Sequence, residues 1–477
     1  MATLTLYKAT TAYFDSYSGS NYDLTSTSWY LFSDTQKVVY GALYGNSLTY
    51  DANKYPVLGT ITAVSSFDKQ GDLQWTLSDI AVASNSVSSL KTILSEGQPF
   101  DRYRYMVSTF LSSNDSILGS SGSDIIAISD GVDTIDGGKG SDWLDFSGRG
   151  YNGLLTVDLV VGQYSNIYNG VKTTHGSFSN IENVTGTSGD DTIIGDNNNN
   201  LFSNSRGNDV INGGGGIDTV SYTNVNNVDA NLINVSVNLA KSTATHSNQY
   251  VFLNSYTDTL INIENIIGST GNDTLIGDSF NNQFTGDLGN DTLEGGEGID
   301  TVIFSNAYRA VTVNLTAGSA TGQGIDKLTN IENIVGSNYN DVLTGSNAIN
   351  LIKANAGNDS LNGRLGNDIL TGGLGQDKFI FNTAIKANID KITDFSVVND
   401  TVQLENAIFT QLTSTGVINS GYFKIAKVAA DSNDYLVYDK TTGALFYDAD
   451  GNGAQIAVQI ATVGVNLALT TADFVVS

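Results

Sequence analysis

The sequence has no cysteine and very little histidine. Without cysteine, its 477 residues can form no disulfide and offer no thiolate to a catalytic or metal site. The two histidines, His175 and His246, stand alone, without the His-Glu-x-x-His spacing of zinc proteases. These absences exclude disulfide-stapled folds and Cys-ligated metal sites, and they argue against zinc-protease chemistry.

Basic residues are also scarce. The chain has 22 Lys and Arg against 49 Asp and Glu, which gives a net charge of −27. Because this charge repels nucleic acid and anionic lipid, we expect no nucleic-acid partner and no membrane insertion. Hydrophobic residues make up 40% of the sequence, enough for a folded core rather than a solvated acidic tail.

The acidic residues are almost all Asp, since only seven are Glu, and the chain has 51 Gly but two Pro. Asp, Asn and Gly accept left-handed backbone and favour turns, whereas Glu favours helix interiors. The composition therefore predicts a mainly β fold that is dense in turns.

An acidic residue recurs every nine residues through the middle of the chain. The phrase Asn-Ile-Glu-Asn stands at 180–183, 262–265 and 330–333, and Asp follows its Glu at intervals of nine. The clearest units are GGKGSDWLD at 137–145 and GGEGIDTVI at 295–303. In each unit six residues can form a turn and three a short strand with one apolar side chain inward.

These units resemble the G-G-x-G-x-D-x-U-x nonapeptide of the RTX family, in which U is a large apolar residue. The resemblance implies a calcium-loaded parallel β-roll with calcium held between the turns of units i and i+2, by backbone carbonyls and Asp carboxylates. It implies roughly a dozen calcium ions. The predicted metal ligands are Asp115, Asp124, Asp133, Asp142, Glu182, Asp191, Asp209, Asp218, Glu264, Asp273, Asp291, Asp300, Glu332, Asp341, Asp359, Asp368 and Asp377.

Without metal the stacked carboxylates repel one another, so we expect the calcium-free repeats to be largely unfolded. The alternative is a metal-free solenoid whose aspartates only cap turns. Some turns depart from the pattern, and we expect these to bind calcium weakly or not at all. They carry Asn200, Asn282 and Asn350 at the Asp position, and Asn198, Phe280 and Ala348 at the fourth position.

Three inserts interrupt the repeats, at 146–176, 222–258 and 304–326. All alternate apolar and polar residues, which predicts strands that lengthen coils of the roll or protrude as hairpins. His175 and His246 fall in these inserts, where an exposed or capping role is expected. The predicted domains are a small β-rich (α+β) domain at 1–108, the roll at 109–380 and a cap at 381–477.

The segment from 381 onward resembles the C-terminal domain of serralysin-type RTX proteins. That resemblance implies a cap on the roll with an uncleaved type I secretion signal at Asp473, Phe474, Val475 and Val476, and the start of the chain shows no secretion signal. The segment from Asp448 matches the opening of an EF-hand loop, but its twelfth residue is Gln459 rather than Glu. A hairpin turn is therefore expected there, with a calcium loop as the alternative.

The first 108 residues differ in composition from the rest. Residues 59–80 predict a hairpin with Asp68 to Asp72 as its turn, whereas 88–94 and 101–111 have helical spacing. This part has no His, no Cys and only one Glu, Glu96, so it lacks a nucleophile–histidine pair and a Glu pair for glycosidase chemistry.

We therefore predict a secreted, non-enzymatic, calcium-binding RTX protein that folds on extracellular calcium. It would be exported by type I secretion machinery and act as a cell-surface, matrix or surface-layer adhesion component, with surface polysaccharide or protein as a partner. The alternatives are a glycan-processing extracellular enzyme with its site in residues 1–108 or in the inserts, and a hemophore-like carrier in which tyrosine alone would bind haem.

Overall fold

The structure is a computed structural model of the chain, and it is almost entirely β in the part that it describes. Short 3-10 helices lie at Leu239–Lys241, Ser420–Tyr422 and Thr471–Asp473. Among the residues described, no helix is long and apolar enough to cross a membrane. The structure describes residues 40–50, 56–67, 73–82, 104–106, 116–119, 122–128, 132–147, 154–168, 171–204, 206–223, 232–248, 255–385 and 388–477.

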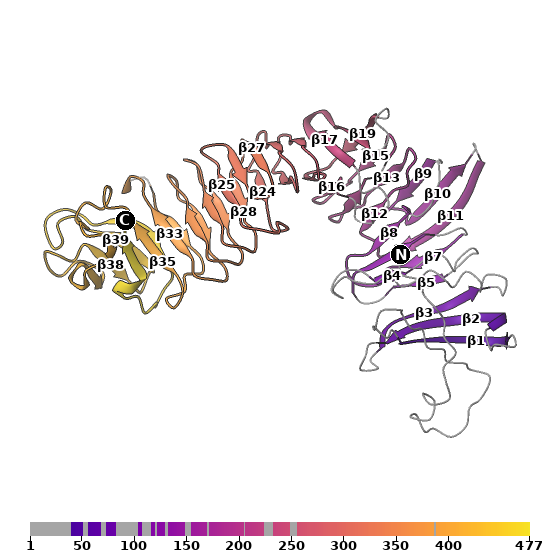
Figure 1. The fold of residues 1–477 in the computed structure, drawn as a ribbon, viewed down its shortest axis with the longest axis horizontal. Coiled ribbons are helices and arrows are strands. Elements are labelled where there is room, and N and C mark those ends of the chain that lie inside the picture. Colours follow the sequence, from indigo (N-terminus) through magenta and orange to yellow (C-terminus); the bar gives the residue numbers. More distant parts are fainter. Residues whose placement is uncertain are drawn as a thin grey trace, which may run out of the picture. The chain divides into compact units, whose positions relative to one another are not determined.

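The chain separates into two compact units. Unit 1 takes the described residues up to 220 and residues 256–262, and unit 2 takes the remaining described residues to 477. Each unit is a stack of short strands (Figure 1).

Unit 1 begins with an antiparallel sheet of three strands, β1 (Tyr40–Tyr50), β2 (Pro56–Phe67) and β3 (Leu73–Val82). Strands β2 and β3 confirm the predicted hairpin, with residues 68–72 between them. The helical spacing at 101–111 was a wrong guide where the structure describes it, because β4 (Arg104–Met106) is a strand that pairs in parallel with β6. Sheet pairing overrides a local helical pattern. The second helical segment, 88–94, lies outside the described residues.

After the three-stranded sheet, the chain of unit 1 forms a roll of two sheets, and most successive strands along the sequence enter these two sheets in turn. In the first sheet β4, β6, β8, β12 and β14 pair in parallel in that order, and β16 follows through a bond from the Thr219 N–H to the Asn200 carbonyl. Apart from β4, its strands are β6 (Asp124–Ala127), β8 (Trp143–Asp145), β12 (Asn183–Thr185), β14 (Leu201–Ser203) and β16 (Thr219–Ser221).

The second sheet of unit 1 has the spatial order β5-β7-β11-β10-β9-β13-β15-β19. Strands β9, β10 and β11 form an antiparallel meander between β7 and β13, whereas the other pairings are parallel. The strands are β5 (Ser116–Leu118), β7 (Thr134–Asp136), β9 (Leu154–Asp158), β10 (Gln163–Tyr168), β11 (Val171–Ser179), β13 (Thr192–Ile194), β15 (Val210–Asn212) and β19 (Ser255–Ile261).

Unit 2 repeats this plan. Its first sheet runs β20-β22-β24-β28-β30-β32-β34-β40-β39-β38-β37 and is parallel up to β40. The strands are β20 (Asn265–Ile267), β22 (Gln283–Thr285), β24 (Thr301–Ile303), β28 (Asn333–Val335), β30 (Leu351–Lys353), β32 (Ile369–Thr371), β34 (Asp390–Ile392), β37 (Phe423–Ile425), β38 (Leu436–Asp439), β39 (Ala444–Tyr447) and β40 (Val458–Thr462).

The second sheet of unit 2 runs β18-β17-β21-β23-β27-β26-β25-β29-β31-β33-β35-β41-β36. Figure 1 shows its strands stacked from β25 and β27 toward β33 and β35. The strands are β17 (Leu232–Asn238), β18 (Thr243–Asn248), β21 (Thr274–Ile276), β23 (Thr292–Glu294), β25 (Thr312–Asn314), β26 (Ser319–Thr321), β27 (Ile325–Thr329), β29 (Val342–Thr344), β31 (Ser360–Asn362), β33 (Lys378–Phe381), β35 (Thr401–Leu404), β36 (Gly416–Val417) and β41 (Phe474–Val476).

The core of each roll is a row of single apolar side chains, one from each short strand. In unit 2, Leu343, Ile352, Leu361 and Leu370 are all fully buried and come from four successive strands. Each stands two residues after the acidic or amide position of its nonapeptide. The sheets confirm the predicted β-roll, in which two units make one coil.

Strands from the inserts enter the second sheet of the rolls. The insert at 146–176 supplies the β9–β10–β11 meander. The insert at 304–326 supplies β25 and β26, and β26 pairs antiparallel with both β25 and β27. The insert at 222–258 supplies the antiparallel pair β17 and β18. Antiparallel strands need only short turns, so they can be added within a parallel sheet without a crossover.

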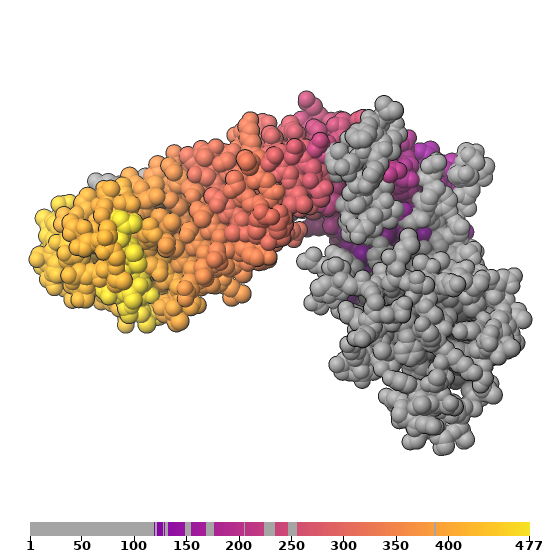
Figure 2. All heavy atoms as spheres, viewed as in Figure 1, coloured from indigo at the N-terminus to yellow at the C-terminus, as the bar shows by residue number. Residues whose placement is uncertain are grey.

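The C-terminal residues cover the end of both sheets of unit 2. Strand β40 extends the first sheet beyond β34, and β41 extends the second sheet beyond β35. The last residues lie against the neighbouring part of the unit as a band on its surface (Figure 2). Of the predicted secretion-signal residues, Asp473, Phe474 and Val476 are buried.

Candidate metal sites

The predicted acidic residues form hydrogen-bonded ladders along the turns. The backbone N–H of Asp341 donates to Oδ1 of Asp359 at 2.7 Å, and the N–H of Asp359 donates to Oδ1 of Asp377 at 2.9 Å. Each step joins one coil to the next, 18 residues later. The same bond links Asp124 to Asp142, Asp191 to Asp209, Asn200 to Asp218, Asp273 to Asp291, Asn282 to Asp300 and Asn350 to Asp368.

The glutamates of the Asn-Ile-Glu-Asn phrases enter the same ladders. Oε2 of Glu182 accepts from the N–H of Asp142 at 2.8 Å, and Oε2 of Glu332 accepts from the N–H of Asp300 at 2.9 Å. The carbonyl of Glu264 accepts from the side-chain amide of Asn282 at 2.8 Å. A longer side chain thus reaches the ladder from a turn of only three residues.

Sequence reasoning missed four ladder carboxylates. The N–H groups of Asp209, Asp291, Asp368 and Asp377 donate to Oδ1 of Asp258, Asp326, Asp390 and Asp400, respectively. The acceptors lie 49, 35, 22 and 23 residues after their respective donors, so they do not follow the interval of nine. Each is nevertheless followed two residues later by a large apolar residue, as in Asp258-Thr259-Leu260, and that shorter pattern would have found them.

The six-residue turns that carry the ladders fall into two classes. In the first class, called closed turns, the N–H at position 2 donates to the acid or amide at position 6, and the side chain at position 2 accepts from the N–H at position 4. In the turn 336–341, Ser337 N–H donates to Asp341 Oδ2 at 2.6 Å, Ser337 Oγ donates to Asp341 Oδ1 at 2.7 Å, and Tyr339 N–H donates to Ser337 Oγ at 3.0 Å. The closed turns are 186–191, 195–200, 268–273, 277–282, 336–341 and 345–350.

Three closed turns end in Asn rather than Asp. Oδ1 of Asn350 accepts from Ser346 N–H at 2.6 Å, while Nδ2 of Asn350 donates to the carbonyl of Glu332, in the preceding coil, at 2.6 Å. Asn200 and Asn282 make the same two bonds. The amide therefore ties two coils together through a backbone carbonyl.

In six turns of the second class, called open turns, the aspartate at position 6 keeps an oxygen with no hydrogen-bond partner. Asp359 and Asp368 are 1% and 0% exposed, and Oδ2 of each accepts no hydrogen bond. The same holds for Oδ2 of Asp142, Asp291, Asp300 and Asp377. The open turns are 137–142, 213–218, 286–291, 295–300, 354–359, 363–368 and 372–377.

The backbone separates the two classes. Positions 2 and 4 of every open turn have positive φ, for example +97° at Gly373 and +143° at Gly375, whereas no residue at these positions of a closed turn does. In open turns the N–H at position 2 points away from the carboxylate: that of Gly373 donates to Asp394 Oδ2, and that of Arg364 to Asn362 Oδ1. The peptide that joins positions 1 and 2 therefore has a different orientation in the two classes, and in these open turns its N–H group does not donate to the carboxylate.

The open turns bury carboxyl groups whose pKa is raised. Burial, together with the charges of Asp341 and Asp377, raises the pKa of Asp359 to about 7. Burial, together with the charges of Asp273 and Asp326, raises the pKa of Asp291 to about 8. A buried carboxylate with an unused oxygen requires either a proton or a cation to compensate its charge.

Calcium fits this donor set. Among the described residues no three His, Cys, Asp or Glu side chains cluster closely enough to hold a metal. The remaining ligands would therefore have to be backbone carbonyls. Oxygen ligands of mixed carboxylate and carbonyl type are those that calcium prefers.

The remaining predicted ligands and histidines have these positions. Asp115 lies outside the described residues. Asp133 accepts a hydrogen bond from the Tyr164 hydroxyl at 3.0 Å, and Asp218 accepts from Asn200. His246 is buried beside Tyr222, with ring centroids 5.6 Å apart, so it is not the exposed residue we expected. His175 lies in β11, where its side chain is not described.

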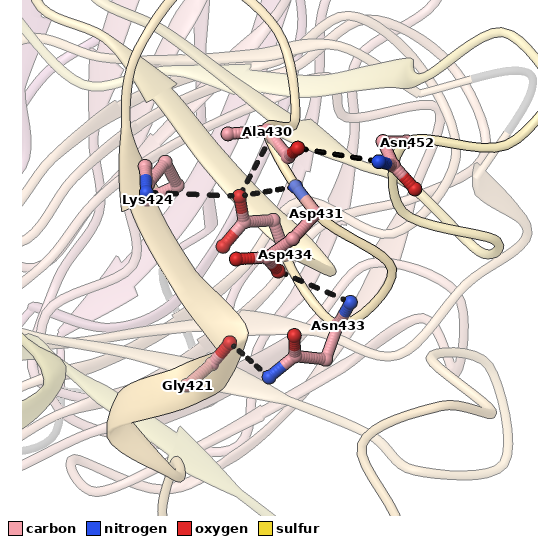
Figure 3. A network of polar contacts seen from close by, with 7 residues as sticks. All are labelled: Gly421, Lys424, Ala430, Asp431, Asn433, Asp434 and Asn452. Atoms are coloured by element: carbon pink, nitrogen blue, oxygen red, sulfur yellow. Dashed lines mark hydrogen bonds and ion pairs between the residues drawn. The ribbon is translucent and has the colours of Figure 1, made fainter.

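The segment from Asp448 is a hairpin connection between β39 and β40, as predicted. The side-chain amide of Gln459 donates to the Ala461 carbonyl within β40, away from a ligand position. Nearby, Asp434 Oδ2 accepts from the N–H of Ala430 at 2.8 Å and lies 4.0 Å from the Lys424 ammonium (Figure 3). Asn452 donates to the Ala430 carbonyl, so protein donors hold this loop region together.

Comparisons with known proteins agree with the ladders. The family model for the RTX calcium-binding nonapeptide repeat, in four copies, matches residues 111–144, 185–220, 267–302 and 344–379. No curated protein matches the sequence. Among solved structures, the extracellular lipase LipA from Serratia marcescens is 12% identical, over 77% of this chain and 39% of the lipase, with a TM-score of 0.11. This chain thus spans about 39% of the lipase, and a likeness this weak carries no argument.

Proposed function

The chain carries RTX calcium-binding repeats in a β-roll, and from that premise we propose that it is a secreted, non-enzymatic protein that folds on extracellular calcium. Its role would be that of a cell-surface, matrix or surface-layer adhesion component. The observation that carries the proposal is the set of buried aspartate oxygens without a hydrogen-bond partner, such as Oδ2 of Asp359 and Asp368.

The electrostatics of the ladder supports calcium-dependent folding. Each open turn buries a carboxylate next to others in the neighbouring coils, and a divalent cation would offset this repulsion. Extracellular calcium modules bind with dissociation constants of about 10⁻⁴ to 10⁻³ M, far above the calcium level of cytosol. The repeats would therefore stay loose inside the cell, suit export by type I machinery, and order outside it.

The non-enzymatic part of the proposal rests on the sequence of the first 108 residues and on the structural use of the acids. That segment has no His or Cys and a single Glu. The ladder acids are used as turn-to-turn hydrogen-bond acceptors rather than as a pair facing a cleft. Release of new reducing ends or unsaturated products from polysaccharides by the purified protein would contradict this part.

The test of calcium-driven folding is circular dichroism of the full chain in EGTA, in calcium and in magnesium. We expect calcium to increase the β signal and magnesium to leave it close to the EGTA spectrum, because magnesium prefers octahedral sites that retain water. Identical spectra in all three conditions would overturn the proposal.

The surface role has a separate test. Intact cells that produce the protein are washed with EGTA plus magnesium, and control cells with calcium plus magnesium. We expect the EGTA wash alone to release the chain into the supernatant. Retention of the chain on the cells after both washes would argue against calcium-held attachment while leaving calcium-driven folding in place.

A further inference from the structure

We propose that the repeats alternate between coils that hold their own turns without metal and coils that depend on calcium, and that calcium binds only at the open turns. The inference rests on the proposed calcium-binding function and specifies which residues carry it. Its clearest example is in unit 2, where the closed coil 336–353 is followed by the open coil 354–371.

The closed coil satisfies its own polar groups. Oδ1 of Asp341 accepts from Ser337 Oγ at 2.7 Å and from the Val311 N–H at 2.8 Å, and Oδ2 accepts from the Ser337 N–H. Asp273 is satisfied in the same way by Ser269 and the Val235 N–H. Burial raises the pKa of Asp341, and it raises that of Asp273 to about 6, but the hydrogen bonds to each carboxylate oppose this effect and favour the charged form.

In the second turn of the same coil, the side-chain amide of Asn350 forms the link to the neighbouring coil that a cation would otherwise form. Nδ2 of Asn350 binds the Glu332 carbonyl of the preceding coil, and its Oδ1 binds the Ser346 N–H of its own turn. Calcium between two turns would likewise bind a carbonyl from the neighbouring coil. The Asn side chain supplies that link with no charge to compensate.

The closed coil also packs against an insert. The meander β25–β26–β27 joins it through β29, where the Val342 N–H donates to the Val311 carbonyl at 2.9 Å. Val311, Val313, Ala320 and Leu343 are at most 1% exposed. Residues 304–353, called the insert block, therefore have an apolar core and saturated turns, the two requirements for order without metal.

The open coil lacks both supports. Asp359 and Asp368 each accept a backbone hydrogen bond on Oδ1 and leave the buried Oδ2 unused. No insert adjoins strands β31 and β32, which pair only with the short strands of neighbouring coils. In unit 1 the open turn 137–142 follows the same pattern, because Oδ2 of the buried Asp142 has no partner.

Two consequences follow. In the absence of calcium, unit 2 would retain an ordered insert block next to a loosened open coil, instead of losing all its structure. Calcium would then order the open coils onto blocks that are already folded. The number of bound ions should follow the open turns of the described chain, 137–142, 213–218, 286–291, 295–300, 354–359, 363–368 and 372–377, rather than every unit of the repeat.

Hydrogen exchange of the full chain, followed by peptide mass spectrometry in EGTA and in calcium, tests the proposal. In EGTA we expect the amides of 336–353 to exchange at least about tenfold more slowly than those of 354–371, and calcium to remove that difference. Equally fast exchange of both segments in EGTA would overturn the inference but leave calcium-driven folding intact. Equally slow exchange of both in EGTA would overturn calcium-driven folding itself.

Two variants separate the roles of the coils. Asn350→Asp removes the donor to the Glu332 carbonyl, so protection of 336–353 in EGTA should fall at least about tenfold and return with calcium. The matched control is Asn306→Asp, on an exposed residue of the same insert block, which adds the same charge and should change nothing. Asp368→Asn should instead reduce the protection of 354–371 in calcium and leave that of 336–353 in EGTA unchanged. The reverse pattern in either variant would overturn the assignment.

Discussion

The two neighbouring coils 336–353 and 354–371 have the same length and the same place in both sheets, yet they differ in how their turns are stabilised. The first has Ser337 and Tyr339 at positions 2 and 4 of its leading turn, with ordinary backbone, and its carboxylate is fully hydrogen-bonded. The second has Asn355 and Gly357 there, both with positive φ, and its carboxylate has an unused oxygen.

This difference shows that the carboxylate alone does not define a calcium site. Asp341 and Asp359 both lie on the ladder and are both buried. The orientation of one peptide decides whether the N–H group at position 2 donates to the carboxylate. A carboxylate that receives this hydrogen bond is stabilised directly, whereas a buried one that lacks it needs a proton or a cation.

The largest expected effect is the pH dependence of stability that the open turns cause in the absence of calcium. In the calcium-free protein, burial raises the pKa of Asp291 and Asp359 to about 8 and 7, from 3.8. The folded state therefore binds more protons than the unfolded chain between about pH 4 and 8, and its stability is present at acid pH and lost as the pH rises through these values. We expect the free energy of unfolding in EGTA to fall by several kcal/mol over this range.

Urea unfolding in EGTA across that pH range measures this effect, with a parallel series in saturating calcium as control. Calcium binds the deprotonated carboxylates, so its stabilisation should grow as the pH rises. A calcium-free protein that becomes more stable from pH 5 to pH 8 would contradict the electrostatic account of the open turns.

The next effect tests the left-handed backbone of open turns. A Cβ on Gly375, where φ is +143°, would lie 1.7 Å from the Gly357 carbonyl oxygen of the preceding coil. Gly375→Ala should therefore cost roughly 3 kcal/mol of stability in calcium. The matched change in a closed turn is Tyr339→Ala, at the same position 4 but with ordinary φ and an exposed side chain, which should cost within about 0.5 kcal/mol. Equal losses in calcium, measured by urea unfolding, would remove the distinction.

A third comparison exchanges the ladder acids themselves. Asp359→Asn should destabilise the protein by about 3 kcal/mol at calcium concentrations a hundredfold above the dissociation constant, because one site is lost. In EGTA the same substitution should be stabilising, since it removes a buried charge that other carboxylates repel. Asp341→Asn should destabilise in both conditions, because Ser337 and Val311 lose a charged acceptor. Thermal unfolding of both variants in calcium and in EGTA reports the signs, and a change of the same sign in both variants in EGTA would refute the assignment.

The smallest effect concerns the serine that closes a turn. Ser337→Ala removes a donor to Asp341 and an acceptor for Tyr339, so it should cost about 1 kcal/mol with or without calcium. Ser360→Ala, on strand β31, is the matched control and should cost less in both conditions. If the loss from Ser337→Ala occurred only in calcium, this turn would belong with the open class.

Much of the fold follows from the sequence. The interval of nine placed Asp191, Asp273 and Asp341 on the ladders, because two nonapeptides make one coil and the spacing of the coils fixes the partners. The alternation of apolar and polar residues in the inserts predicted that they contain strands. The helical spacing at 101–111 is a wrong guide for residues 104–106, because these residues form β4, which pairs with β6.

The candidate sites were only partly predictable. Asp258 and Asp326 were not predicted, because the inserts place them far along the sequence from the ladder residues that they contact. The turn class also depends on more than one residue. Asp278 and Asp287 both occupy position 2, but the first turn has Phe280 at position 4 and is closed, whereas the second has Gly289 and is open. Competition between the two peptide orientations is decided in three dimensions.

Scanning calorimetry of the full chain in calcium and in EGTA tests the central claim most directly. We predict that calcium adds a large, higher-temperature unfolding transition for the open coils, and that EGTA removes this transition and leaves a smaller one from the parts that close their own turns. The same thermogram in both conditions would contradict the account, because the buried carboxylates would then need no cation.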